Sequence, residues 1–151
     1  TLFRSVLQAV KSGATAVLLE WPAGTYEIAG DTIRIDECGM NPRQFASRKT
    51  GHRLVDDFEP EDFRFWYDAS QDCVTPLLST TFRHDAWNPI LKSGNGVWRG
   101  DWGPTFAVAE RTLGQGRLVL CQLHLAGRID GNPVADTFAR RLLAGPAAQV
   151  E

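Results

Sequence analysis

The sequence predicts a single α/β domain, and three features of its 151 residues support this prediction. A helical apolar pattern, a glycine and an apolar strand follow one another near the N-terminus, as in a layer of helices packed on a sheet. Two strand-like runs flank a glycine-containing turn in the second half. An asparagine–proline pair, typical of a helix start, precedes a last amphipathic helix. We expect one domain over residues 1–145 and a loose tail over 146–151.

The first half contains four predicted elements. The apolar spacing predicts a helix over Leu2–Lys11, and the apolar run Ala14–Leu19 predicts a buried strand. Tyr26–Ile28 and Thr32–Ile35 are expected to pair as a small hairpin. The polar stretch Cys38–Tyr67 is too long for a simple connection, so we expect a lid or short helices there.

The second half is richer in strands. Val74–Phe82 is expected to form one strand, and Trp87–Leu91 a short one that Pro89 interrupts. Thr105–Thr112 and Arg117–Leu125 should form an antiparallel hairpin. The helix that begins after Pro133 should place four apolar side chains on one face, namely Val134, Phe138, Leu142 and Leu143.

Composition and charge exclude several function classes. Hydrophobic residues make up 43% and charged residues 23%, which is typical of a globular protein. With 16 Lys and Arg against 18 Asp and Glu, the formal charge is -2, so neither nucleic acid nor a membrane is an expected partner. The three cysteines lack metal-site spacing, and we expect no metal and no cofactor. These features leave the compartment undetermined.

The N-terminal residues Thr1–Ser5 match the translation of a sequencing adapter. We therefore expect them to be a non-native remnant at the edge of a fragment. Because the chain then begins inside a helix, we also expect the first strand of the sheet to be missing.

A cysteine nucleophile is one enzymatic hypothesis. Class I glutamine amidotransferases place a thiol in a Gly-x-Cys-x-Gly turn and follow it with a His-x-Glu pair. Cys38 lacks the flanking glycines, and His124 is followed two residues later by Ala126 instead of an acid. The three positions therefore resemble a degenerate triad, and no catalytic residue is predicted there.

Carboxylates and His52 offer weaker candidates. Glu20 follows the apolar run, where α/β enzymes place functional groups, but no partner carboxylate for glycosidase chemistry is positioned. His52 is expected to make loop hydrogen bonds. A solvated loop is the expected role of five acidic residues, Asp56, Asp57, Glu59, Glu61 and Asp62.

The glycine-rich loop over residues 96–103 carries the best binding candidates. Exposed indoles of Trp98 and Trp102 can stack on sugar rings, while Arg99 and Asp101 bond hydroxyls. Equally, the tryptophans can pack inward or against a neighbouring domain. The sequence leaves these alternatives open.

Several motifs carry a resemblance to a known family. They are Phe45-Ala46-Ser47-Arg48, Thr50-Gly51-His52, Pro60 to Tyr67, Gly114-Gln115-Gly116-Arg117, Cys121-Gln122-Leu123 and Asn132-Pro133-Val134-Ala135. From Phe45 to Leu143, about two thirds of the chain, the sequence resembles a C-terminal module of bacterial proteins related to glycoside hydrolase family 2.

This resemblance implies a flavodoxin-like three-layer fold, similar to class I glutamine amidotransferases without their active site. A comparable fold occurs in the trimerisation region of some bacterial β-galactosidases. It implies a non-catalytic accessory module of a β-galactosidase-like or β-mannosidase-like enzyme that shapes the active-site rim or makes oligomer contacts. The implied partners are other domains of the parent chain, carbohydrate or a second copy, and the parent is periplasmic, secreted or cytoplasmic. The alternatives are a carbohydrate-binding module and a thiol-dependent amidotransferase or hydrolase.

Overall fold

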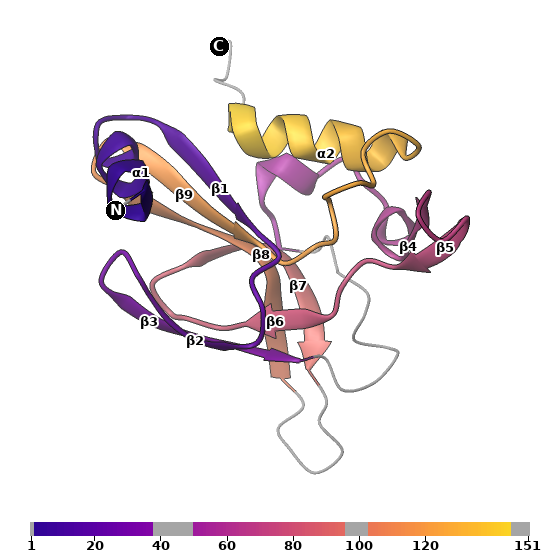
Figure 1. The fold of residues 1–151 in the computed structure, drawn as a ribbon, viewed down its shortest axis with the longest axis horizontal. Coiled ribbons are helices and arrows are strands. Elements are labelled where there is room, and N and C mark those ends of the chain that lie inside the picture. The colour runs from indigo at the N-terminus through magenta and orange to yellow at the C-terminus, as the bar shows by residue number, and fades with distance from the viewer. Residues whose placement is uncertain (1, 38–49, 96–102, 146–151) are drawn as a thin grey trace.

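A computed structural model of the chain describes residues 2–37, 50–95 and 103–145. These residues form a mixed α/β domain in which a curled sheet of seven strands lies between two helices (Figure 1). A separate two-stranded hairpin projects beside the second helix. The predicted fold class is confirmed at this level.

The N-terminal elements agree with the sequence pattern. Helix α1 spans Leu2–Lys11 and strand β1 spans Thr15–Leu19. Strands β2 (Gly24–Ile28) and β3 (Asp31–Glu37) form the predicted antiparallel hairpin. Gly30 takes a positive φ of 87° in its turn, a conformation that glycine adopts without steric cost.

The remaining elements follow in chain order. Two short 3₁₀ helices, η2 (Arg53–Val55) and η3 (Pro60–Phe63), precede the hairpin of β4 (Phe65–Asp68) and β5 (Cys73–Pro76). The main sheet then gains four strands: β6 (Thr80–Phe82), β7 (Asn88–Asn95), β8 (Gly103–Leu113) and β9 (Gly116–Cys121). Helix α2 spans Pro133–Ala144.

The sheet has the strand order β1-β9-β8-β6-β3-β2, and β7 pairs with the other edge of β8. Strands β1 and β9 run parallel, whereas the other strand pairs of the described residues are antiparallel. The hairpin predicted for residues 105–125 is present as β8 and β9. A flavodoxin-like three-layer fold has a mostly parallel sheet, whereas one strand pair of the described residues is parallel here, so that arrangement is not confirmed.

Strand β9 separates two hydrophobic cores. Because successive side chains of a strand point to opposite faces, Leu118 and Leu120 enter the core beneath α1, while Val119 and Cys121 enter the core beneath α2. All four side chains are fully buried. The two helices therefore cover opposite faces of the same strand (Figure 1).

Three expectations from the sequence are wrong in detail. Residues 74–82 form two strands in different sheets, because residues 77–79 leave β5 and run beside the segment that follows β9. Strand β1 is only partly buried, since it pairs with β9 along one edge and leaves Leu19 42% exposed. Leu143 is 64% exposed, because Phe138 and Leu142 occupy the buried face of α2.

The start of β9 packs tightly against the end of α1. A Cβ atom at Gly116 would lie 2.0 Å from the carbonyl oxygen of Val10 and 2.2 Å from that of Ala14. Backbone atoms cannot move away as a flexible side chain can. This position therefore requires glycine for steric reasons.

We predict that Gly116→Ala destabilises the protein by at least about 1–3 kcal/mol, because the added methyl group overpacks a backbone contact. Gly131→Ala is the matched control, since its Cβ would meet only the Tyr67 ring at 3.5 Å, an ordinary contact. The free energy of unfolding of both variants is measured by urea titration. Equal midpoints for the two variants would contradict the proposed packing constraint.

Candidate functional site

The carboxyl ends of the parallel strands β1 and β9 lie side by side and carry polar residues. Glu20 follows β1, and its backbone N–H donates to the carbonyl of Cys121 at 2.8 Å. Gln122 and His124 follow β9 directly. In α/β proteins, ligands bind beyond the carboxyl ends of parallel strands, so this edge is a candidate ligand site.

A third segment completes the cluster. Leu78 forms an isolated antiparallel bridge with Leu123, and the backbone N–H of His124 donates to the carbonyl of Leu77 at 2.8 Å. This pairing brings Ser79 beside the imidazole of His124. The cluster is thus assembled from three segments that lie far apart in the sequence.

Ser79, His124 and Glu20 form a continuous hydrogen-bonded relay. The Ser79 hydroxyl lies 2.8 Å from Nε2 of His124, and Nδ1 of the same ring lies 2.7 Å from Oε1 of Glu20. The backbone N–H of Ala126 donates to the second carboxylate oxygen of Glu20 at 3.3 Å. The carboxylate is therefore oriented from two sides.

Gln122 holds the segments on either side of the relay. Its side chain is 1% exposed, accepts from the backbone N–H of Trp21 at 3.1 Å and donates to the Trp21 carbonyl at 2.7 Å. The same amide nitrogen donates to the Thr80 hydroxyl at 2.6 Å. Since Trp21 follows Glu20 and Thr80 follows Ser79, one buried amide positions both outer members of the relay.

The relay changes the interpretation of the degenerate triad. The amidotransferase pattern has an acid two residues after the histidine, where this sequence has Ala126. In the structure Glu20 supplies the carboxylate from the neighbouring parallel strand, and Ala126 contributes its backbone N–H. Cys38 lies outside the described residues.

Sequence reasoning missed Ser79 and Gln122. A glutamine that directly follows the apolar run of β9 was the available signal for Gln122, because a buried amide needs hydrogen-bond partners. Nothing in the sequence marked Ser79 among the other serines. The four predicted sugar-binding residues, Trp98, Arg99, Asp101 and Trp102, lie outside the described residues.

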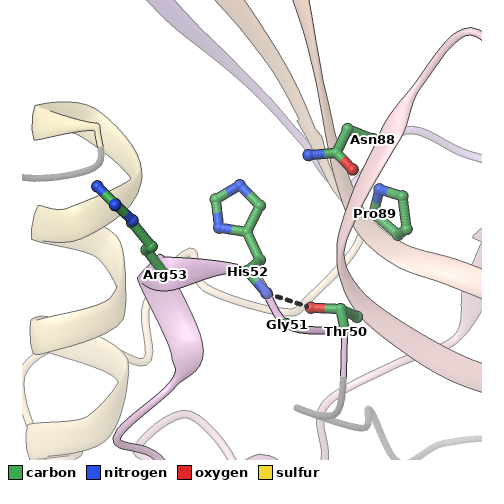
Figure 2. Close-up of a pocket in the computed structure, with 6 residues that line it drawn as sticks. All are labelled: Thr50, Gly51, His52, Arg53, Asn88 and Pro89. Atoms are coloured by element: carbon green, nitrogen blue, oxygen red, sulfur yellow. Dashed lines mark hydrogen bonds between the residues drawn. The ribbon is translucent and has the colours of Figure 1, made fainter.

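His52 belongs to a separate, partly buried network beside a pocket of about 250 Å³. Figure 2 shows the lining residues, Thr50, Gly51, His52, Arg53, Asn88 and Pro89. His52 Nδ1 accepts from the Leu54 N–H at 3.2 Å, and Nε2 lies 2.7 Å from Oε1 of Glu110. Both ring nitrogens are committed, which confirms the predicted hydrogen-bonding role.

The same network ties α2 to the sheet. Arg117 donates to Oε2 of Glu110 at 2.6 Å and also to the carbonyl oxygen of Leu142. Burial favours the protonated form of Glu110, but the hydrogen bonds from His52 and Arg117 outweigh it and lower the pKa of this carboxyl group. Glu110 is therefore a charged, structural group.

The hairpin of β4 and β5 exposes apolar side chains on its outer face. Phe65, Tyr67 and Val74 are 50%, 40% and 65% exposed, and Tyr67 and Val74 are direct cross-strand partners. The inward-facing Trp66 and Asp68 are buried. The acidic residues near this hairpin are mostly exposed, as predicted, and Asp57 pairs with Arg141 at 2.8 Å.

Comparisons with protein-family models, curated proteins and solved structures each found no significant match. In the described parts of the chain, no group of three or more His, Cys, Asp or Glu residues is placed to hold a metal ion. No helix within the described ranges has the length and apolar character that crossing a membrane requires.

We predict that Cys121 resists alkylation in the native protein, while Cys73 reacts. Burial raises the pKa of the Cys121 thiol to about 12, whereas Cys73 is exposed. Only the thiolate is nucleophilic. Iodoacetamide treatment at pH 8 followed by peptide mass spectrometry measures both sites, with urea-unfolded protein as the control in which both react. Equal labelling of the two cysteines in folded protein would contradict this prediction.

We also predict that Glu110 makes stability depend on acid. Because its pKa is lower when folded than its ordinary value of 4.5, its stabilisation is complete above that value and is lost as the pH falls through the lowered pKa. Glu110→Gln should flatten the loss of unfolding free energy below pH 4.5. Asp136→Asn, which removes an exposed partner of Arg140, is the control, and a flattening of equal size in this variant would contradict the assignment to Glu110.

Proposed function

We propose that this chain is an accessory module of a larger glycoside hydrolase-related protein and that it makes contacts between copies of that protein. The observation that carries this proposal is the exposed apolar face of the β4–β5 hairpin. The family resemblance of the sequence supports the carbohydrate context. The flavodoxin-like three-layer fold that this resemblance implies is part of the same proposal. In this proposal the module makes contacts between copies, and a separate barrel domain of the parent protein cleaves the glycosidic bond.

The hairpin is built as a rigid platform. An isolated two-stranded hairpin is marginally stable in water, so its attachment to the body matters. Asn132 binds both backbone groups of Tyr67 at 2.9 Å, and Arg128 pairs with Asp68 at 3.2 Å. The Tyr67 hydroxyl donates to Asp72 at 2.6 Å, which orients the ring. A platform held in this way loses little conformational entropy on contact.

The outer face has the chemistry of a protein contact. Exposed apolar side chains that cluster on one surface mark interaction sites, and aromatic residues contribute most to such interfaces. Phe65 and Tyr67 stand on one side of β4, and Val74 lies opposite Tyr67. In Figure 1 the hairpin projects from the body beside α2, so a second copy can reach it.

We predict that the wild-type chain self-associates and that Phe65→Ser/Tyr67→Ser is monomeric. Sedimentation velocity over a concentration series measures the association. Leu143→Ser is the matched control, because Leu143 is 64% exposed on α2 and lies outside the hairpin. A wild-type chain that stays monomeric at every concentration, or a double variant that associates equally well, would refute contact through this face.

Carbohydrate binding is the second candidate, because exposed aromatic rings can also stack on sugars. Titration with galactosides, mannosides and glucuronides, followed by tryptophan fluorescence, separates the two candidates. A saturable change that Trp98→Ala/Trp102→Ala abolishes would assign sugar binding to that loop. A change that only Phe65→Ser/Tyr67→Ser abolishes would assign it to the hairpin, and no change from the folded chain would leave contact between copies as the function.

A further inference from the structure

The relay of Ser79, His124 and Glu20 has the connectivity of a hydrolytic centre. The carboxylate contacts Nδ1 of the imidazole and the hydroxyl contacts Nε2, at 2.7 and 2.8 Å. A carboxylate accepts hydrogen bonds, so Nδ1 carries the proton in the neutral ring and Nε2 has a free lone pair. The Ser79 hydroxyl then donates to Nε2, which is the arrangement that general-base activation of serine requires.

The orientation of Glu20 is determined by its surroundings. Its backbone φ is +51°, a left-handed conformation that is strained for a non-glycine residue. The N–H of Glu20 bonds to the Cys121 carbonyl, and the Ala126 N–H bonds to its carboxylate. Ala29 and Asp72 also have positive φ, so the backbone conformation alone identifies no site. The contacts of the Glu20 carboxylate with His124 and Ala126 identify the site independently of the backbone conformation.

Accessibility distinguishes this relay from the other histidine network. The side chains of His124 and Glu20 are 28% and 27% exposed, and Ser79 is exposed at the surface. The His52 side chain is 8% exposed and has no hydroxyl partner in the described residues. The relay therefore presents a hydroxyl and a basic ring nitrogen to a substrate, whereas both ring nitrogens of His52 are already bonded to Leu54 and Glu110.

We propose that Ser79, His124 and Glu20 hydrolyse small carboxylic esters. The Ser79 oxygen forms a bond to the acyl carbon while its proton moves to Nε2 of His124. The ester carbon–oxygen bond then breaks, and the leaving alkoxide takes that proton. Water releases the acyl group by the same steps, so carboxylic acid, alcohol and the original relay result.

Each residue has a distinct role in this reaction. Ser79 is the nucleophile and His124 the general base and acid, because both touch the reacting atoms. Glu20 is a positioning residue that holds the tautomer and stabilises the imidazolium. Gln122 keeps Glu20 and Ser79 at their places through Trp21 and Thr80. An ester suits an open surface site, since its leaving group needs less assistance than an amide nitrogen.

The decisive experiment measures acetylation of Ser79 by 4-nitrophenyl acetate. A stopped-flow trace should show a burst of 4-nitrophenol, and peptide mass spectrometry should place the acetyl group on Ser79. Ser79→Ala should abolish the adduct, and His124→Ala should lower the acylation rate by about 100-fold or more. Glu20→Gln should lower it by a similar factor, because the amide no longer selects the Nδ1–H tautomer.

Three controls keep the result interpretable. His84→Ala removes another partly exposed imidazole and tests for non-specific hydrolysis, while Ser12→Ala removes an exposed serine whose hydroxyl donates to the carbonyl of Gln8. Both should retain the wild-type rate. Phe65→Ser/Tyr67→Ser should also retain it, so that loss of self-association and loss of esterase activity are distinguishable. Nitrogen-15 NMR should show the Nδ1–H tautomer of His124 in the wild type and its loss in Glu20→Gln.

Specific outcomes would overturn the proposal. A folded wild-type chain that forms no Ser79 adduct would refute it, as would an adduct that forms equally fast in His124→Ala. Acetylation spread evenly over lysines and other serines would assign the reaction to general surface nucleophilicity. Urea midpoints of all variants verify that a lost rate does not result from unfolding.

Discussion

The pairing of β9 on both of its edges is the constraint on which the other parts of the structure depend. Strand β9 is parallel to β1 and antiparallel to β8, and its side chains alternate between two cores. Helix α1 packs over one core and α2 over the other. Because both faces are buried, apolar side chains are needed at every position from Leu118 to Cys121. A polar substitution there would bury a polar group without a hydrogen-bond partner in one of the two cores.

The polar cluster exists because β1 and β9 end together. Their parallel register, which pairs Leu19 with Cys121, places Glu20 beside Gln122 at the same edge. Burying the Gln122 amide costs free energy, and three hydrogen bonds to Trp21 and Thr80 offset that cost. These hydrogen bonds fix the backbone next to Glu20 and Ser79, and both of these residues contact the partly exposed His124. The buried amide of Gln122 therefore supports the exposed relay of Ser79, His124 and Glu20.

Two histidine networks show how the same residue types take different roles. The side chains of His52, Glu110 and Arg117 are 8%, 15% and 14% exposed, and the guanidinium of Arg117 compensates the carboxylate charge. His124 and Glu20 are partly exposed, and the second ring nitrogen of His124 meets a hydroxyl instead of a backbone N–H. The first network joins α2 to the sheet, whereas the second leaves a lone pair beside a nucleophile. The two networks differ in their burial and in the group on the second ring nitrogen, which is the Leu54 N–H for His52 and the Ser79 hydroxyl for His124.

The sequence by itself determined the local elements. Apolar spacing placed α1 and α2, glycine-containing turns placed the β2–β3 and β8–β9 hairpins, and the family resemblance suggested a parallel sheet. Only the tertiary structure decided that most strands pair antiparallel, that residues 77–79 run beside residues 123–124, and that Glu20 serves His124. Periodicity reports which face of an element is apolar, but it carries no information about which distant segment will supply the hydrogen-bond partner. That choice follows from strand register and from the need to satisfy buried polar groups, both of which arise only when the chain has folded.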